Sequence, residues 1–261
     1  MAMATETQIS RIITEVQPSV ARISLHNAPL NVIDLQMMDE LAQAVSEIEG
    51  RSEVSAILIS GYGGSFSAGV DVAAHTPDKV EAMLSKFHAV IRALVSTTKV
   101  TIVAVNGHCL GGGAELAMIC DLVYTTEDAQ WGFPEIKLGC YPPVAVTALA
   151  ALVGQKHAAD LILTGRTISG SEAASTGLAN RAVPKDQLED VVEDALEHLS
   201  KLSTAALAIT KEAIYAWDSI HFDKGLARAE KIYLDELMKT EDAREGINAF
   251  LEKREPQWKR K

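Results

Sequence analysis

Short runs of β-branched and aliphatic residues alternate with amphipathic helical patterns along the first part of the chain. Two such runs, at residues 11–16 and 20–25, are separated by a Gln-Pro-Ser sequence typical of a tight turn, so they predict a β-hairpin. Apolar positions then recur with a helical period over 35–48, which predicts a helix. Asp34 is suited to cap its first turn, and Gly50 ends the pattern.

Three further strand-length runs follow, at 55–60, at 101–105 and near 122–124. A Thr-Pro-Asp sequence at 76–78 predicts the start of a helix between the first two runs, because proline and an acidic residue both favour a first helical turn. Glycines follow the run at 101–105 and lead into another helical pattern. This order of ββα and βα units predicts an α/β fold, a stacked spiral of strands flanked by helices.

From about Pro184 onward the pattern is purely helical. Its amphipathic stretches are residues 188–199, 205–217 and 222–238, followed by a last helix from the expected cap Thr240 through Phe250. No low-complexity linker separates this part from the rest of the chain. We therefore divide the chain into a spiral core, residues 1–190, and a C-terminal helical region, residues 191–261.

The composition narrows the functional classes. With 48% hydrophobic residues the 261-residue chain can fill a substantial core, but its longest apolar runs fall short of the roughly 18 residues of a membrane span. The net charge of −11 disfavours nucleic acid as a partner. The start of the chain lacks the basic region and apolar segment of a secretory signal, so we expect a cytoplasmic protein that binds no membrane.

Neither a disulfide scaffold nor a metal site is expected. The three cysteines, Cys109, Cys120 and Cys140, form no Cys-x-x-Cys pair, and an odd number without secretion indicates reduced thiols. The seven histidines are scattered along the chain, whereas a metal site needs clustered ligands.

Two glutamates, each beside its own backbone signal, indicate where the chemistry lies. Glycines 111–113 stand between a strand run and a helical stretch that contains Glu115. Glycine at such a junction lets the backbone approach a ligand and direct free N–H groups at it, and a carboxylate one turn into the helix is held nearby. Glu135 follows in a Phe-Pro-Glu sequence. N–H donors next to two carboxylates suit proton transfer beside a carbonyl group.

A third segment strengthens this interpretation. The run at 55–60 also ends in glycines and leads into Ser65-Phe66-Ser67-Ala68-Gly69-Val70-Asp71, a loop of small residues able to offer another N–H. A lone glycine triplet is usually only a tight turn, and a lone helical glutamate is usually solvated. Only the three segments together therefore predict proton transfer beside a carbonyl group.

These three segments resemble the crotonase family, which comprises enoyl-CoA hydratases and isomerases. The likeness runs from Asn27-Ala28-Pro29-Leu30-Asn31 to the segment 250–254. The resemblance implies a crotonase-like spiral of ββα repeats, an acyl thioester of coenzyme A as the substrate, and no further cofactor. It also implies that the C-terminal helices cover the active site and build homotrimers, often paired into hexamers.

The resemblance also assigns roles to residues. The N–H groups of Val70 and Gly112 would form an oxyanion hole for the thioester oxygen, and Glu115 and Glu135 would be the catalytic pair of a hydratase. Further contacts with the substrate or coenzyme A would come from Ala28, Ala68, Gly69, Asp71, Tyr141, Phe250 and Lys253. The basic residues near the end of the chain are equally compatible with a phosphate-binding patch and with a solvated tail.

The turn after Glu135 departs from the ordinary hydratase pattern. Straight-chain hydratases usually have a glycine-rich turn here, whereas this chain has Cys140-Tyr141-Pro142-Pro143, whose prolines remove N–H donors and stiffen the turn. The change is either a neutral loop variant or a reshaped acyl pocket. Together with residues 68–80, the turn resembles the cyclohexa-1,5-diene-1-carbonyl-CoA hydratases of anaerobic aromatic degradation, which add water to a conjugated cyclic dienoyl thioester.

Three classes of function remain. A hydratase uses both glutamates, an enoyl-CoA isomerase would move a proton with one carboxylate and no water, and a non-catalytic scaffold would need neither. Among other side chains, His75 is expected at the surface or at a pocket rim. Trp131 and Phe133 would either line the acyl pocket or fill the core.

Overall fold

The computed structural model describes residues 10–215 and 218–259. Its strands are β1 (Ile12–Gln17), β2 (Ser19–Leu25), β3 (Val54–Gly61), β4 (Val100–Val105), β5 (His108–Leu110), β6 (Leu122–Thr126), β7 (Gln130–Gly132), β8 (Thr167–Ser169) and β9 (Arg181–Val183). Its α-helices are α1 (Leu35–Glu49), α2 (Val80–Ser96), α3 (Gly112–Met118), α4 (Pro143–Thr164), α5 (Gly170–Thr176), α6 (Leu188–Ser200), α7 (Thr204–Tyr215), α8 (Asp218–Asp235) and α9 (Glu241–Leu251). Short 3-10 helices are η1 (Val72–His75), η2 (Pro134–Leu138), η3 (Lys185–Gln187) and η4 (Leu237–Lys239).

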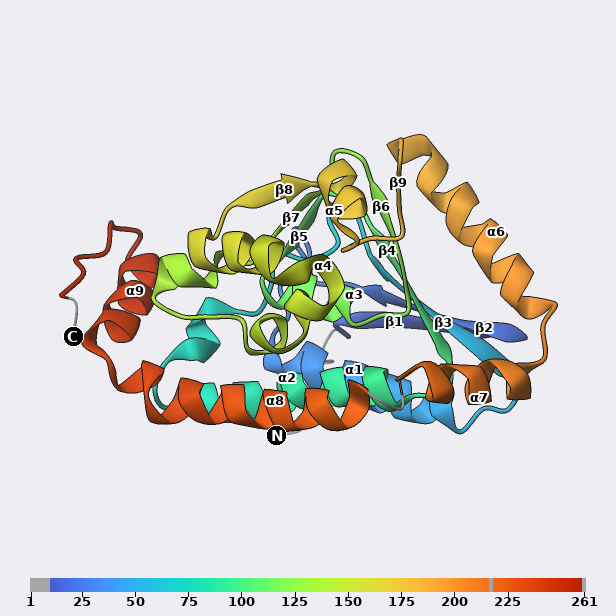
Figure 1. The fold of residues 1–261 in the computed structure, drawn as a ribbon, viewed down its shortest axis with the longest axis horizontal. Helices are drawn as coiled ribbons and strands as arrows, with labels where there is room; N and C mark the ends of the chain where they lie inside the picture. Colours follow the sequence, from blue (N-terminus) through green and yellow to red (C-terminus); the bar gives the residue numbers. More distant parts are fainter. Residues whose placement is uncertain (1–9, 216–217, 260–261) are drawn as a thin grey trace, which may run out of the picture.

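The strands form two sheets, as Figure 1 shows. The larger has the order β1-β2-β3-β4-β6-β9, in which β1 and β2 make the predicted antiparallel hairpin and all later neighbours are parallel. The smaller has the order β5-β7-β8. The predicted α/β class is therefore confirmed. Because parallel strands end at the same edge of a sheet, the loops that follow β3 and β4 emerge side by side.

Alternate residues of the central strands face two different cores. Ile57 and Ile59 of β3 belong to the main core, which the helices α1 to α4 also build. Ala56 and Leu58 point to the other face and pack with Val192 of α6. The sheet is thus buried on both faces, which explains why its parallel strands are continuous apolar runs in the sequence.

The C-terminal helices occupy two different places. Figure 1 shows α6 and α7 at one end of the large sheet, which both helices contact, and α8 running beneath α2 and α4. The helix α9 packs on η1 and η2. Residue 190, the expected boundary between two regions, lies inside α6. Because Val192 of α6 packs on the sheet, this helix is built into the core, whereas α8 and α9 lie against the segments that carry the site.

Most element boundaries follow the sequence pattern, with one shift. Asp34 and Thr240 cap α1 and α9 as predicted. The helix expected from residue 76 starts later, at Val80, because the Thr76 carbonyl first closes a turn with the N–H groups of Lys79 and Val80, each at 2.9 Å. The predictions for residues 1–9, for the helix end at 216–217 and for the basic residues 260–261 lie outside the described residues.

By length and composition alone, α4 qualifies as a possible membrane span among the described helices, with a mean hydropathy of 1.2 over its most apolar window. No apolar run of that length was expected from the sequence. Core helices of globular proteins pass the same test, so this is weak evidence. Within this fold α4 packs on α8, and Gly154 interrupts it with a φ of 79°.

Candidate active site

The loops after β3 and β4 are held together by backbone hydrogen bonds. The N–H of Phe66 donates to the Asn106 carbonyl at 2.7 Å, and the N–H of Ser67 donates to the His108 carbonyl at 2.8 Å. In return, the Ser67 carbonyl accepts from the Leu110 N–H at 3.0 Å. The two loops therefore form one rigid unit, although more than thirty residues separate them in the sequence.

A buried asparagine holds the loop after β3 in place through hydrogen bonds. The Asn31 side chain is fully buried, and its Nδ2 donates to the carbonyls of Tyr62 and Ser65 at 3.0 and 2.8 Å. The Ser67 hydroxyl donates to the Asn31 carbonyl at 2.7 Å. The segment 27–31 thus braces the loop, and Ala28, which was expected to contact the substrate, does not line the cavity that the loops enclose.

The predicted oxyanion hole has two N–H groups without a hydrogen-bond partner among the described residues. Both neighbours of the Val70 N–H are engaged, because Ile33 donates to the Gly69 carbonyl at 2.9 Å and accepts from the Asp71 N–H at 3.1 Å. Gly112 is the first residue of α3, where an N–H has no acceptor within the helix. A Cβ atom added to Gly112 would lie 3.4 Å from the Val70 nitrogen. The two N–H groups therefore lie close to each other, as an oxyanion hole requires.

Each glycine of the triplet is required by a different close contact. A Cβ on Gly111, whose φ is +52°, would lie 2.6 Å from Glu135 Oε1. A Cβ on Gly112 would lie 2.6 Å from Val70 Cγ2, and one on Gly113 would lie 2.8 Å from the Cβ of Ser67. The triplet thus lets α3 begin directly against both the first loop and the second carboxylate.

Glu115 is buried on α3, with 3% of its surface exposed. Its Oε1 accepts hydrogen bonds from the N–H groups of Val144 and Ala145, at 2.8 and 3.0 Å, in the first turn of α4. Pro143 occupies the first helical position, where a missing N–H costs nothing. The two prolines remove their own N–H donors from the turn, as expected, and the next two N–H groups bind Glu115.

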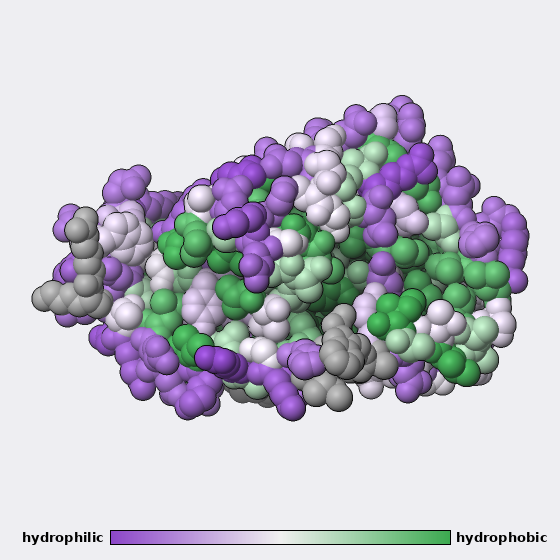
Figure 2. All heavy atoms as spheres, in the orientation of Figure 1, coloured by the Kyte–Doolittle hydropathy of each residue, from purple (hydrophilic) through white to green (hydrophobic). Residues whose placement is uncertain are grey.

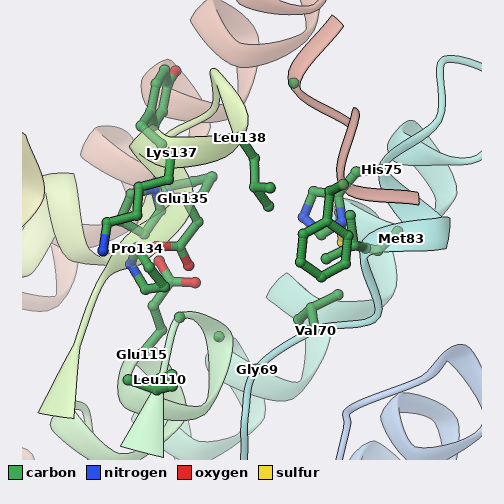
Figure 3. A pocket seen from close by; sticks show the side chains of 18 of the residues that line it. Gly69, Val70, His75, Met83, Leu110, Glu115, Pro134, Glu135, Lys137 and Leu138 are labelled. Carbon is green, nitrogen blue, oxygen red and sulfur yellow. The ribbon is translucent and has the colours of Figure 1, made fainter. Parts of the chain in front are cut away.

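Glu135 lies on η2 in a different environment. Its Oε2 is buried and has no hydrogen-bond partner among the described residues, while its Oε1 lies against the backbone of Gly111. Figure 3 shows the Glu115 and Glu135 carboxyl groups directed toward each other on one side of the cavity. The two side chains therefore form a pair with unequal hydrogen bonding.

Burial and proximity shift both carboxyl groups. Burial raises the pKa of Glu115 to about 7, while the N–H groups of Val144 and Ala145 act in the opposite direction. Burial, and then the nearby charge of Glu115, raise the pKa of Glu135 well above its ordinary value. We infer that near neutral pH the pair carries one proton on Glu135 and one charge on Glu115, because two helix N–H groups stabilise a charge on Glu115 whereas Glu135 has only its own backbone N–H.

The Glu115 and Glu135 side chains line a cavity of about 410 Å³. Eight of the predicted site residues line it: Ala68, Gly69, Val70, Gly112, Glu115, Glu135, Tyr141 and Phe250. Asp71 and Lys253 do not, and the Asp71 carboxylate instead caps η1 by accepting from the Ala73 N–H at 3.0 Å. Residues that were not assigned to the site also line the cavity, among them His75, Met83, Lys137, Tyr233 and Arg254.

The helix α8 of the C-terminal region forms part of the cavity wall. The Tyr141 hydroxyl donates to the Ala229 carbonyl at 2.6 Å, and the Tyr141 ring packs edge-on against Tyr233 with 5.2 Å between centroids. The turn before α4 is thus fastened to α8. Trp131 and Phe133 are fully buried and do not line the cavity, so they fill the core. Among the described residues, no group of three His, Cys, Asp or Glu side chains is arranged to hold a metal ion.

The raised carboxyl pKa values predict a pH-dependent stability cost. A carboxyl group whose pKa is raised in the folded state contributes its full stability at pH values below its pKa in the unfolded chain. This contribution is lost as the pH rises through the pKa of the folded state, which is about 7 for Glu115. Glu115→Gln should therefore raise the free energy of unfolding above pH ~8 by at most ~3 kcal/mol. Near pH ~5 it should change little.

Denaturant unfolding of the wild type and Glu115→Gln across this pH range measures the difference. Glu127→Gln, which alters an exposed carboxyl group, controls for the loss of one charge. A Glu115→Gln protein whose stability relative to the wild type does not rise with pH would show that the Glu115 carboxyl group pays no burial penalty in the fold.

Comparison with known proteins places the chain in a family. Residues 15–261 match the model of the enoyl-CoA hydratase/isomerase family. A cyclohexa-1,5-dienecarbonyl-CoA hydratase from Thauera aromatica is 35% identical over 240 residues, covering 92% of this chain and 93% of its own. A probable enoyl-CoA hydratase from Bacillus subtilis is 36% identical over 252 residues, covering 94% of this chain and 96% of its own.

The fold agrees with solved structures of the same family. An enoyl-CoA hydratase/isomerase from Xanthobacter autotrophicus superposes with a TM-score of 0.84 at 30% identity, covering 94% of this chain and 97% of its own. An enoyl-CoA hydratase from Mycobacterium avium gives a TM-score of 0.86 at 26% identity, covering 96% and 99%. Sequence and fold together identify the chain as a member of the enoyl-CoA hydratase/isomerase, or crotonase, family.

Proposed function

We propose that this protein adds water across the double bond of 2-enoyl thioesters of coenzyme A, with Glu115 as the base and Glu135 as the acid. The observation that carries the proposal is the unequal carboxyl pair beside two free N–H groups. Glu115 is bound by two helix N–H groups, while Glu135 Oε2 has no partner in the described part of the chain. Such a pair can accept a proton at one carboxyl group and donate one at the other.

The reaction follows from this geometry. The N–H groups of Val70 and Gly112 bind the thioester oxygen and stabilise the negative charge that develops on it. The water oxygen bonds to C3 as Glu115 takes the water proton, and the Glu135 proton passes to C2. The thioester carbonyl then re-forms, and the proton on Glu115 returns to Glu135, because two N–H groups stabilise the charge on Glu115. An isomerase would use one carboxylate and no water, so the buried pair favours hydration.

We further propose that the acyl group is compact, with a cyclic dienoyl thioester as the specific candidate. The relative from Thauera aromatica bears the name of a cyclic dienoyl-CoA hydratase. In this chain the cavity wall includes the rings of Tyr141 and Tyr233, and the Tyr141 hydroxyl is fastened to Ala229. A fixed aromatic wall suits a flat ring and excludes most conformers of a long chain. Lys137 and Arg254, which also line the cavity, are suited to the phosphates of coenzyme A.

The molecular surface favours a homo-oligomer, which we propose to be a trimer or a hexamer. Apolar side chains gather over α4 and α7 (Figure 2), where Leu163, Ile209 and Ile214 expose 70%, 66% and 63% of their surface. Exposed apolar patches of this kind are typical of subunit contacts. Light scattering coupled to gel filtration gives the mass that tests this proposal.

The first functional prediction concerns the two carboxyl groups. Glu115→Gln and Glu135→Gln should each lower kcat by roughly 10²–10⁴, because each removes one proton-transfer group. Thioester binding, measured by calorimetry, should remain. Loss of the enoyl-thioester absorbance measures the rate, and Glu127→Gln is the control for a distant carboxyl group. Near wild-type kcat in either variant would remove that residue from the mechanism.

The second prediction concerns the oxyanion hole. In Gly112→Ala the new Cβ would lie 2.6 Å from Val70 Cγ2 and 3.3 Å from Phe87 Cζ, so the Val70 side chain or the start of α3 must shift, and we expect this to disturb the pair of N–H groups. We expect kcat to fall by roughly 10²–10³. Gly50→Ala is the matched control, because its Cβ would meet only the Glu47 carbonyl, at 3.6 Å. A fully active Gly112→Ala enzyme would disprove the assignment of this N–H.

The third prediction concerns acyl size. We expect kcat/KM for crotonyl-CoA and for cyclohexa-1,5-diene-1-carbonyl-CoA to exceed that for dec-2-enoyl-CoA by about 10-fold or more, because the wall excludes chain conformers. Tyr141→Ala should narrow this ratio, whereas Tyr141→Phe, which keeps the ring, should narrow it less. Steady-state kinetics with the three thioesters give the ratio. A wild-type preference for decenoyl-CoA would contradict a compact pocket.

A further inference from the structure

His75 stands apart from the other polar groups of the cavity. It is the last residue of η1 and is half-buried. In Figure 3 its ring lies on the opposite side of the cavity from Glu115 and Glu135, near Met83 and Val70. A polar ring in an apolar wall, facing the reacting groups across the cavity, has no part in the hydration chemistry described above.

The His75 ring is held in one orientation. Its Nδ1 lies 3.1 Å from the Asp71 carbonyl oxygen. A carbonyl can only accept, so Nδ1 carries the hydrogen. Asp71 is itself fixed, because its N–H donates to Ile33 at 3.1 Å and its carboxylate binds the Ala73 N–H at 3.0 Å. The backbone that supports the oxyanion loop therefore also orients the imidazole.

This orientation leaves Nε2 as a hydrogen-bond acceptor. Burial lowers the pKa of His75, against the opposing effect of Asp71, so the ring is neutral near pH 7. In the neutral ring with hydrogen on Nδ1, Nε2 has a free lone pair. Among the described residues, the hydrogen-bond partners of the ring are the backbone of Asp71 and of Val72, and no side chain donates to Nε2.

The neighbouring polar groups do not meet this need. The Tyr141 hydroxyl already donates to the Ala229 carbonyl at 2.6 Å. Arg254 is bound to Glu245 at 2.6 Å. Lys137 lies across the cavity from His75 (Figure 3), and the N–H groups of Val70 and Gly112 are assigned to the thioester oxygen, so a ligand or water is left as the partner of Nε2. A ligand that places a hydrogen-bond donor next to Nε2 pairs best with this acceptor in the apolar wall.

We propose that His75 Nε2 accepts a hydrogen bond from a hydroxyl group on the acyl chain, so that the site selects hydroxylated compact enoyl thioesters. This inference deepens the proposed hydratase function and rests on it for the position of the thioester. An acceptor in an apolar wall discriminates against a methyl group in place of a hydroxyl, because the methyl group leaves the acceptor unpaired. His75 is thus a specificity-determining residue that touches the acyl group and takes no part in bond making.

The test uses substrate pairs that differ only by hydroxyl against methyl. These are trans-4-hydroxybut-2-enoyl-CoA with pent-2-enoyl-CoA, 5-hydroxypent-2-enoyl-CoA with hex-2-enoyl-CoA, and 6-hydroxyhex-2-enoyl-CoA with hept-2-enoyl-CoA. The trans double bond prevents ring closure of the hydroxyl onto the thioester. For each pair, kcat/KM is measured in the wild type, and Kd is measured by calorimetry in Glu135→Gln, where turnover should be suppressed.

We expect at least one pair to favour the hydroxyl compound by about 10-fold in both readouts. His75→Leu should abolish or invert that preference, because leucine has no acceptor. His75→Gln, which restores an acceptor oxygen at similar reach, should retain part of it. This rescue separates hydrogen bonding from a change in cavity shape.

Two results would overturn the inference. One is a ratio within about 2-fold for all three pairs in the wild type. The other is an equal loss of both members of each pair in His75→Leu, which would mean that His75 binds an amide N–H of the pantetheine arm common to all thioesters. Failure of the hydratase proposal has a different signature, namely no turnover of any enoyl thioester, and the Kd ratios still decide the role of His75 in that case.

Discussion

The hydrogen bonds from the N–H groups of Val144 and Ala145 to Glu115 Oε1 determine how the carboxyl pair shares its proton. Two buried carboxyl groups in contact cannot both be ionised without a large cost. The first turn of α4 stabilises the charge on Glu115 and offers nothing to Glu135, whose Oε2 has no partner among the described residues. The proposed base and the proposed acid are thus built from the same residue type.

That arrangement depends on where α4 begins. Pro142 and Pro143 precede the donor residues, and proline is favoured at the first position of a helix because its φ is already helical. Tyr141 then fastens the turn to α8 through the Ala229 carbonyl. A helix from the end of the chain therefore controls the position of N–H groups that set the charge on Glu115. This links the C-terminal region to the chemistry without any direct bond to the substrate.

The oxyanion hole depends on a second constraint, the parallel pairing of β3 and β4. Since both strands end at one edge, their loops meet, and Asn31 and Ser67 hold the first loop against the second. Glycine at 111–113 allows α3 to approach both this loop and Glu135. The same braced backbone orients His75 through the Asp71 carbonyl. One rigid unit thus carries the donors for the thioester and a wall residue for the acyl group.

Much of this site could be predicted from the sequence, because its main signals are local. The strand runs, the glycine triplet and the glutamates follow one another within short segments, and the helix caps Asp34 and Thr240 are correct. The start of α2 was placed one turn early, since a turn closed by the Thr76 carbonyl resembles a first helical turn in sequence. The short strands β5, β8 and β9 were missed because three-residue strands have too little periodicity to detect.

The remaining errors concern contacts between distant segments. The prolines were correctly expected to remove N–H donors, but the sequence does not reveal that the N–H groups after Pro143 meet Glu115. Tyr233 was missed because its place in the wall depends on how α8 packs, which no local pattern encodes. Asp71 was predicted to contact the ligand and instead caps η1, and an acidic residue before a short helix was the signal that could have indicated this role.

Isotope-edited infrared spectroscopy of glutamate-labelled protein tests the charge assignment most directly. At pH ~8, above the value of about 7 for Glu115, exposed carboxyl groups are ionised and a protonated carboxyl group gives a separate band. We predict that the band of the protonated carboxyl group is present in the wild type and in Glu115→Gln and is lost in Glu135→Gln. A wild-type spectrum without the band, or a band that is lost in Glu115→Gln and kept in Glu135→Gln, would contradict it.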